Sequence, residues 1–209
     1  MLSIKLAKKI VYTGTVTLKT GLHIGGTNAA LNIGGPDKFV VRNPINNVPY
    51  IPGSSLKGKM RALVEIANGE TNNGKPTNNP YSRAGQLFGI SGDTDSSRPS
   101  RLIVRDAELD VNATDFSNTD LPFTESKTEV SIDRVTAKAN PRTFERVPAG
   151  AKFCLNMVLN VFESDNENQL KKTLGQAIQL LQDDYLGGHG SRGYGQVQIE
   201  IHNEEEKTY

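Results

Sequence analysis

Residues 8–19 alternate between apolar and polar side chains, and this alternation limits the fold more than any other feature of the chain. Side chains along a β-strand point to opposite faces in turn, so the pattern predicts an antiparallel strand with one buried face and one face in water. The residues predicted to face the core are Ile10, Tyr12, Val16 and Leu18. The chain therefore needs a sheet that is covered on one side only.

The remaining elements follow an order that indicates a fold class. Apolar residues at helical spacing predict a helix that begins at Ser54 or Ser55, as its N-cap, and ends near Asn68. A short helix is predicted over residues 82–89 and a long one over residues 166–184. Strands are predicted over residues 101–109, 151–163 and 196–202. The order strand, helix, strand, then strand, helix, strand fits an α+β, ferredoxin-like fold with helices on one face of an antiparallel sheet.

Irregular and polar segments indicate insertions in a single domain. The chain has 209 residues, which suits one domain over residues 1–209. The polar residues 68–100 predict a mobile insertion, and the charged residues 124–148 predict an inserted hairpin that stands off the core. Residues 204–209 are expected to fray.

Composition excludes several classes of protein. Hydrophobic residues make up 36% and charged residues 22%, so the chain is neither disordered nor embedded in a membrane. Its start lacks the apolar stretch of a signal peptide. The only cysteine, Cys154, excludes an internal disulfide framework and a cysteine-based zinc site, and we expect it to be a buried small hydrophobe in a cytoplasmic protein. The net charge of +1 means that any nucleic-acid site must arise from local clustering.

Residues 187–195 form the first stretch that could carry a function, because five of the nine are glycine. Gly188 and its neighbours would let the backbone approach a ligand, and free N–H groups there can bind an anion. Ser191 and Arg192 would add a hydroxyl and a charge for a phosphate, and Tyr194 could stack on a base. The alternative is a mobile linker between a helix and a strand.

Residues 50–61 form a second such stretch, with three cations and no acid. Ser54 and Ser55, with the first N–H groups of the predicted helix, could bind an anion. Lys57 and Arg61 lie one helical turn apart and could follow a phosphate backbone, with Lys59 as the third cation. The alternative is a capped surface helix with solvated lysines.

The irregular residues 21–49 contain Asp37, which follows Gly-Gly-Pro. An acid on a stiff turn can bind a divalent metal or take a proton from a ribose hydroxyl, but it can equally be a turn former. His23 could be a base, an RNA contact or a hydrogen-bonded structural histidine. It is not expected to form a ligand cluster with His189 and His202.

Residues 124–146, which include Arg134, are either a solvated insertion or an arm that binds nucleic acid.

Several motifs follow one another along the chain: TGLHIGG at 20–26, the Asp37 loop with VRNP at 41–44, IPGSSLKGKMR at 51–61, LIVRD at 102–106, IDRVTAKANPR at 132–142 and YLGGHGSRGYG at 185–195. Together they resemble the backbone subunit of type III-A (Csm) CRISPR complexes, in the RAMP superfamily. The glycine-rich loop is a feature of the whole superfamily. The GSSLKG stretch combined with the IDR arm is much more specific.

This resemblance implies a modified ferredoxin-like (RRM-like) core with an inserted thumb hairpin and long loops. It implies several copies arranged along a guide RNA (crRNA), other subunits of the CRISPR effector complex, and a thumb that displaces a base pair of the guide–target duplex. It also implies cleavage of complementary target RNA at regular intervals, in antiviral defence. The cofactor would be Mg²⁺ or Mn²⁺, and a ribose 2′-hydroxyl would attack to leave a cyclic phosphate.

The resemblance also implies roles for individual residues. Asp37 would be the catalytic residue and would orient either the metal ion or the attacking hydroxyl. The implied RNA contacts, together with those suggested above, are His23, Ser54, Ser55, Lys57, Lys59, Arg61, Arg134, Gly188, Ser191, Arg192 and Tyr194. The acids Asp106, Glu125, Glu129 and Glu145 match the family, and we expect structural ion pairs rather than catalysis from them.

Three functions remain open at this point. The chain could be a target-RNA endonuclease that is also a scaffold, or a scaffold that only binds crRNA. A guide-processing endonuclease is less favoured, because it prefers a histidine-centred site and the three histidines are scattered.

Overall fold

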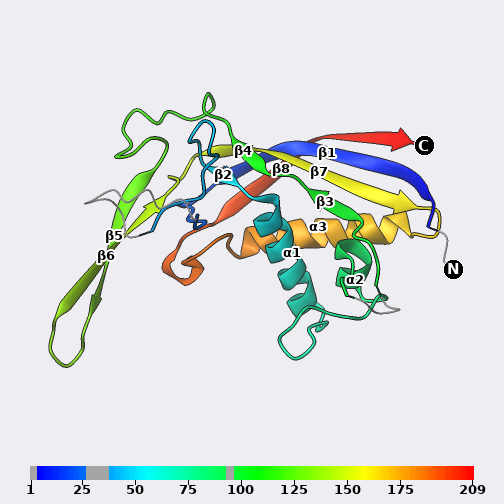
Figure 1. Ribbon diagram of the computed structural model, residues 1–209, viewed down its shortest axis with the longest axis horizontal. Coiled ribbons are helices and arrows are strands. Elements are labelled where there is room, and N and C mark those ends of the chain that lie inside the picture. Colours follow the sequence, from blue (N-terminus) through cyan, green and yellow to red (C-terminus); the bar gives the residue numbers. More distant parts are fainter. Residues whose placement is uncertain (1–3, 27–37, 93–96) are drawn as a thin grey trace.

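The computed structural model describes residues 4–26, 38–92 and 97–209 (Figure 1). Its elements are β1 (Leu6–Leu18), β2 (Tyr50–Ile51), α1 (Gly53–Ala67), α2 (Arg83–Phe88), β3 (Leu102–Val104), β4 (Ala107–Leu109), β5 (Glu125–Ile132), β6 (Ala139–Arg146), β7 (Lys152–Phe162), α3 (Glu167–Asp183), the 3₁₀ helix η1 (Gly190–Arg192) and β8 (Val197–Thr208). The main sheet has the strand order β2-β4-β7-β1-β8, with β3 also paired to β7, and every pairing is antiparallel. The predicted α+β class is confirmed.

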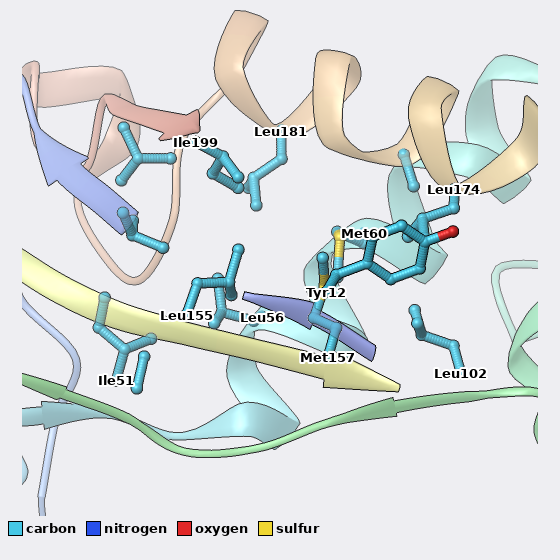
Figure 2. Close-up of a cluster of buried hydrophobic side chains, with 14 of the residues drawn as sticks. Tyr12, Ile51, Leu56, Met60, Leu102, Leu155, Met157, Leu174, Leu181 and Ile199 are labelled. Carbon is cyan, nitrogen blue, oxygen red and sulfur yellow. The ribbon is translucent and has the colours of Figure 1, made fainter. Parts of the chain in front are cut away.

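Strand β1 lies between β7 and β8 and provides the centre of the sheet. The residues predicted to face the core are all buried, with Ile10 and Val16 at 0% exposure. Helices α1 and α3 cover this face only (Figure 1). In Figure 2, Tyr12 and Met157 from the sheet point toward Met60 of α1 and Leu174 of α3. This packing between the two layers forms the core.

The N-terminus of α1 differs from the prediction. The cap residue is Pro52, whose side chain makes no capping hydrogen bond, and neither Ser54 nor Ser55 caps the helix. Instead the Gly53 N–H donates to Asp106 Oδ1 at 2.7 Å. Asp106 lies between β3 and β4, so a residue 53 positions away supplies the acceptor that the local sequence does not.

Residues 68–100 are not wholly outside the core. The predicted short helix is confirmed as α2, with the Ser82 hydroxyl accepting from the Gly85 N–H at 2.9 Å. Ala84, Leu87 and Phe88 of this helix are buried among core residues. The rest of the segment includes residues 93–96, which lie outside the described part, and its mobility stays a prediction.

The predicted inserted hairpin is present as β5 and β6, which pair from Glu125↔Arg146 to Ile132↔Ala139. This two-stranded sheet is separate from the main one and projects away from it (Figure 1). Most of its side chains are exposed, but Phe144 and Glu145 at its base are buried. The hairpin is therefore anchored at one end only.

Two predictions about the sheet are wrong. Residues 204–209 do not fray, because β8 continues to Thr208 and pairs with β1 as far as Lys8. Ion pairs support this extension, from Lys8 to Glu206 at 2.9 Å and from Lys171 of α3 to Glu204 at 2.6 Å. Cys154 is exposed rather than buried, because it alternates with the buried Phe153 and Leu155 and so faces away from the helices. Among the described residues, no helix is both long enough and apolar enough to cross a membrane.

Candidate nucleic-acid interface

The open face of the main sheet carries small and polar side chains at its centre. On β1 these are Lys9, Val11, Thr13, Thr15 and Thr17. Their partners on β7 are Asn160, Val158, Asn156, Cys154 and Lys152. RNA-binding sheets of this type stack bases on aromatic rings of the central strands, and these ten positions provide no such ring. The loops and the hairpin at one end of the sheet are therefore the better candidate interface.

The glycine-rich loop packs tightly against the body of the protein. Gly187 has a φ of +75°, and a Cβ there would lie 2.4 Å from the carbonyl oxygen of His23. A Cβ on Gly190 would lie 2.1 Å from the ring of Tyr185. Both positions require glycine for packing, so the loop is not a mobile linker.

Several backbone donors of this loop are already used inside the protein. The Gly188 N–H donates to the His23 carbonyl oxygen at 2.9 Å, and the Gly195 N–H donates to the Gly21 carbonyl oxygen at 3.0 Å. These two groups are therefore not free to bind an anion. An RNA contact of Gly188 would have to rely on close backbone approach instead.

Side chains of the loop divide into exposed and buried ones. Ser191 is exposed, and the Arg192 side chain is 58% exposed. Arg192 Nη1 donates to Glu129 Oε2 of β5 at 2.7 Å, which joins the loop to the hairpin. Ser191 and Arg192 are thus placed where a phosphate could reach them.

Tyr194 is only 1% exposed, and the prediction that its ring stacks on a base does not fit this burial. Lys127 Nζ lies 4.6 Å from the centre of the ring, and the Arg146 guanidinium lies 4.9 Å from it. Burial raises the pKa of Tyr194 to about 12, and the neighbouring Glu129 carboxylate adds to the shift. The ring therefore supports the junction between loop and hairpin.

His23 has the surroundings of a structural histidine. It is 5% exposed, and its Nδ1 lies 2.7 Å from the carbonyl oxygen of Glu145. Its ring lies 5.6 Å from that of His189, centre to centre, so these two histidines meet although no sequence pattern predicts it. Burial lowers the pKa of His189, and His23 contributes to the shift. His202 lies apart and hydrogen-bonds to Thr15 at 2.9 Å.

The three cations of α1 reach three different partners. Lys59 pairs with Asp184 at 2.8 Å and lies 3.6 Å from the centre of the Tyr185 ring. Arg61 pairs with Glu65 at 2.8 Å. Lys57 Nζ donates to Ser100 Oγ at 2.8 Å, and burial, with a contribution from Arg61, lowers the pKa of Lys57.

These partners decide which cation is available to RNA. No acid among the described residues forms an ion pair with Lys57, whereas Lys59 and Arg61 are both neutralised. Ser54, at the start of the same helix, is exposed, and Ser55 is half-buried. Ser54 and Lys57 are therefore the best placed of the predicted contacts on α1.

Asp37 lies outside the described residues, but both flanks of its segment are described. The Gly26 N–H donates to the Phe39 carbonyl oxygen at 3.1 Å, and the Val41 N–H donates to the Ile24 carbonyl oxygen at 2.8 Å. These bonds hold the two described flanks, residues 24–26 and 39–41, side by side. Asp37 falls between these flanks in sequence.

Glu145, at the base of the hairpin, bonds to the chain that follows residues 27–37. Its backbone N–H donates to the Lys38 carbonyl oxygen at 3.0 Å, and its Oε2 accepts from the Val40 N–H at 2.8 Å. Its Oε1 accepts from Thr124 Oγ1 at 2.7 Å and pairs with Arg42. Sequence reasoning missed this cluster, although Arg42 stands in the quoted VRNP motif.

The other acids also have structural partners: Glu125 and Glu129 form the expected ion pairs, whereas Asp106 accepts a backbone hydrogen bond instead. Glu125 pairs with Arg146 at 2.7 Å, and Asp106 and Glu129 make the contacts described above. At the hairpin tip, Asp133 Oδ1 accepts from the N–H groups of Val135 and Thr136, at 2.9 and 2.8 Å. Arg134 is exposed in this turn, beside Val135, which is 94% exposed.

Donors for a metal are sparse in the described part of the chain. No group of three or more histidine, cysteine, aspartate or glutamate side chains there could hold a metal ion. A protein-only cage is therefore not available from these residues. A single carboxylate completed by phosphate oxygens and water, which is the usual arrangement for Mg²⁺, would not need such a cage.

Comparison with known proteins gives consistent matches over most of the chain. Residues 15–198 match the RAMP superfamily. The chain is 43% identical over 196 residues to the CRISPR system Cms endoribonuclease Csm3 of Streptococcus thermophilus, covering 92% of this chain and 87% of that protein. It is 37% identical over 210 residues to the protein of the same name from Methanothermobacter thermautotrophicus, covering 93% and 85%.

A solved structure supports the same relationship. A crystal structure of the Csm3-Csm4 subcomplex in the type III-A CRISPR-Cas interference complex contains a chain that is similar with a TM-score of 0.61 and 30% identity. The similarity covers 98% of this chain and 90% of the other.

Proposed function

The chain belongs to the RAMP superfamily, in the same family as the Csm3 endoribonucleases, and from this we propose that it is a backbone subunit of a type III-A CRISPR effector complex. In this role several copies line up along a crRNA, together with other subunits of the complex. Each copy cleaves the complementary target RNA at its own position, so the products are regularly spaced.

One structural observation carries this proposal beyond the family name. The two described flanks of residues 27–37, between which Asp37 lies in sequence, are bonded to each other, and the second flank is bonded to the buried Glu145 at the base of the projecting hairpin. A hairpin that displaces a base pair would thus project from the place where the chain enters and leaves the segment with the proposed catalytic acid. Displacement matters because a stacked A-form helix does not allow in-line attack of a 2′-hydroxyl on the adjacent phosphate.

The proposed chemistry needs one acid and one divalent metal, Mg²⁺ or Mn²⁺. Asp37 would hold the metal together with phosphate oxygens of the RNA and water, an arrangement in which one protein carboxylate is enough. The metal supplies charge stabilisation for the reacting phosphate. The 2′-hydroxyl attacks that phosphate, the 5′-oxygen of the next nucleotide leaves, and a cyclic phosphate remains.

Contacts to the guide would come from the exposed or unpaired members of the predicted set. Ser54 and Lys57 lie on α1, Ser191 and Arg192 on the glycine-rich loop, and Arg134 at the hairpin tip. His23 and Tyr194 are buried, so they would act by supporting the loop.

A scaffold that binds crRNA without cleaving is the second candidate. It is compatible with the fact that four predicted acids are engaged by other protein groups, namely Asp106, Glu125, Glu129 and Glu145. The difference between the two candidates then depends on Asp37. Guide processing is less favoured, since the buried His23 bonds to the Glu145 carbonyl oxygen and His189 packs against Phe144.

The test uses the complex reconstituted with crRNA and its other subunits. End-labelled complementary RNA is added with Mg²⁺, with Mn²⁺ or with a chelator, for the wild type, Asp37→Ala and the control Glu125→Gln. We expect a regular ladder of products from the wild type and the control. Asp37→Ala should bind the target but give no ladder, and a chelator should abolish it. An unchanged ladder from Asp37→Ala would move the site elsewhere, and no ladder from the wild type would leave only the scaffold role.

A further inference from the structure

The only direct side-chain ion pair between the hairpin and the glycine-rich loop in the described part of the chain joins Glu129 to Arg192. Glu129 Oε2 accepts from Arg192 Nη1 at 2.7 Å, across 63 positions of sequence. The Arg192 side chain is 58% exposed, whereas that of Glu129 is 16% exposed. The contact thus uses one corner of an exposed guanidinium and leaves the rest of it facing solvent.

Glu129 is incompletely satisfied in this position. Its other oxygen, Oε1, is buried and has no hydrogen-bond partner among the described residues, and the nearest cation, Lys127, is 3.7 Å away. Burial alone would raise the pKa of Glu129, but the adjacent Tyr194 hydroxyl and the Arg192 guanidinium hold it below its ordinary value. Glu129 is therefore an ionised carboxylate. Its Oε2 atom forms a short ion pair with Arg192, whereas its Oε1 atom lies 3.7 Å from Lys127.

The surroundings of Glu129 are those of an anion site. Lys127 and Arg146 lie over the ring of Tyr194, and Arg192 approaches from the loop. Three cations therefore converge on one junction. Glu125, the other acid nearby, is already paired with Arg146 at 2.7 Å.

We propose that Glu129 is an internal stand-in for an RNA phosphate at Arg192, and that an RNA phosphate displaces its carboxylate when the protein binds RNA. This inference rests on the proposed RNA-binding function. Glu129 does not touch RNA in this scheme: it is a positioning residue that holds the Arg192 side chain in place until RNA arrives.

The exchange is physically reasonable because the two anions compete for the same donors. A guanidinium has five N–H groups in a planar fork that matches two phosphate oxygens, and Glu129 engages Nη1 only. Displacement breaks one partly exposed ion pair, which has a small stabilising effect. The contacts of Lys127 and Arg146 with the Tyr194 ring would still join the hairpin to the loop.

The experiment is a double-mutant cycle on the full chain. The affinity for a fluorescently labelled single-stranded RNA is measured by anisotropy at several salt concentrations, for the wild type, Glu129→Gln, Arg192→Gln and the double variant. Glu125→Gln is the matched control, because it removes a hairpin carboxylate from an arginine that lies over Tyr194. Thermal melting establishes that each variant is folded.

We expect Glu129→Gln to bind RNA about threefold to fivefold more tightly than the wild type, the size of one partly exposed ion pair. Arg192→Gln should weaken binding and lower the salt dependence by about one phosphate contact. In the Arg192→Gln background, Glu129→Gln should have no more effect than Glu125→Gln.

Other results would overturn the inference. If Glu129→Gln and Glu125→Gln act alike with Arg192 present, the effect is only the loss of a negative charge. If Glu129→Gln weakens binding, Glu129 holds Arg192 in its RNA-bound position. If the wild type binds RNA and Arg192→Gln binds it equally well, Arg192 is not a phosphate contact. The proposed role of Glu129 is then refuted, while the proposed function of the protein stands. If no variant binds RNA, both fail together.

Discussion

The carboxylate of Glu145 pairs with the guanidinium of Arg42 at a site where these side chains are 2% and 13% exposed. Glu145 belongs to the base of the hairpin, and Arg42 belongs to the chain that leaves residues 27–37. The same carboxylate accepts from Thr124 and from the Val40 N–H. Removal of its charge would leave Arg42 buried without a counter-ion.

We therefore predict that Glu145→Gln lowers the free energy of unfolding by about 3 kcal/mol, because a buried charge would lose its partner. Urea denaturation measures this value. Glu125→Gln is the control: its ion pair is more exposed, and it should cost under about 1 kcal/mol. Equal effects of the two variants would contradict the importance of the buried cluster.

The cap of α1 provides a second test, because the sequence and the structure point to different residues. Asp106→Ala should lower the free energy of unfolding by about 1 kcal/mol, as the Gly53 N–H loses its acceptor. Ser54→Ala and Ser55→Ala should change it by less than about 0.5 kcal/mol, since neither side chain caps the helix. A larger effect of either serine than of Asp106 would refute the assignment.

The two lysines of α1 should differ in RNA binding. Lys57→Ala should reduce affinity and lower the salt dependence by about one phosphate contact, because Lys57 has no acidic partner among the described residues. Lys59→Ala should have a smaller effect, since Asp184 and the Tyr185 ring already engage Lys59. Anisotropy titrations at several salt concentrations compare them, and the reverse order would contradict the prediction.

Tyr194 should titrate at high pH. Its pKa is raised from the ordinary 10.0 to about 12, so the buried neutral ring stabilises the protein fully below pH 10. This contribution is lost as the pH rises through 12. Absorbance of tyrosinate should show a transition near pH 12 that Tyr194→Phe reduces. If Tyr194→Phe instead removes a transition near pH 10, the ordinary value, and leaves the one near pH 12 unchanged, the ring is not buried.

The end of β8 should be protected from hydrogen exchange. Residues 204–208 pair with β1, and Lys171 and Lys8 hold Glu204 and Glu206. We expect those amides that donate to β1 to exchange slowly, and Lys171→Ala to speed this exchange while the amides of residues 197–201 that face β1 stay protected. Fast exchange over residues 204–208 in the wild type would restore the prediction of a frayed end.

Local patterns were sufficient for the helices and for the central strands. The alternation in β1 identified its buried face, and the predicted long helix over residues 166–184 begins after Asn166, whose side chain accepts from the Gln169 N–H at 3.1 Å. Both features depend on neighbours in sequence. The hairpin was likewise expected, because residues 124–148 are charged and have few large apolar side chains.

Long-range partners account for what the sequence could not predict. The glutamates at 204–206 suggest a solvated end when the sequence is considered alone. In the structure, lysines of β1 and α3 form ion pairs with two of them. Tyr194 suggests a stacking ring until Lys127 and Arg146 of the hairpin cover it. His23 meets His189 only because the glycine-rich loop folds back onto residues 21–23.

Cys154 gives the chain a single thiol, exposed on the sheet face that the helices leave open. A spectroscopic label attached there would report from one known position, since no other cysteine competes for it. In an assembly of several copies, each label would occupy the same place on its subunit. Distances between labels would then measure the subunit repeat directly, without any change to the hairpin, the glycine-rich loop or α1.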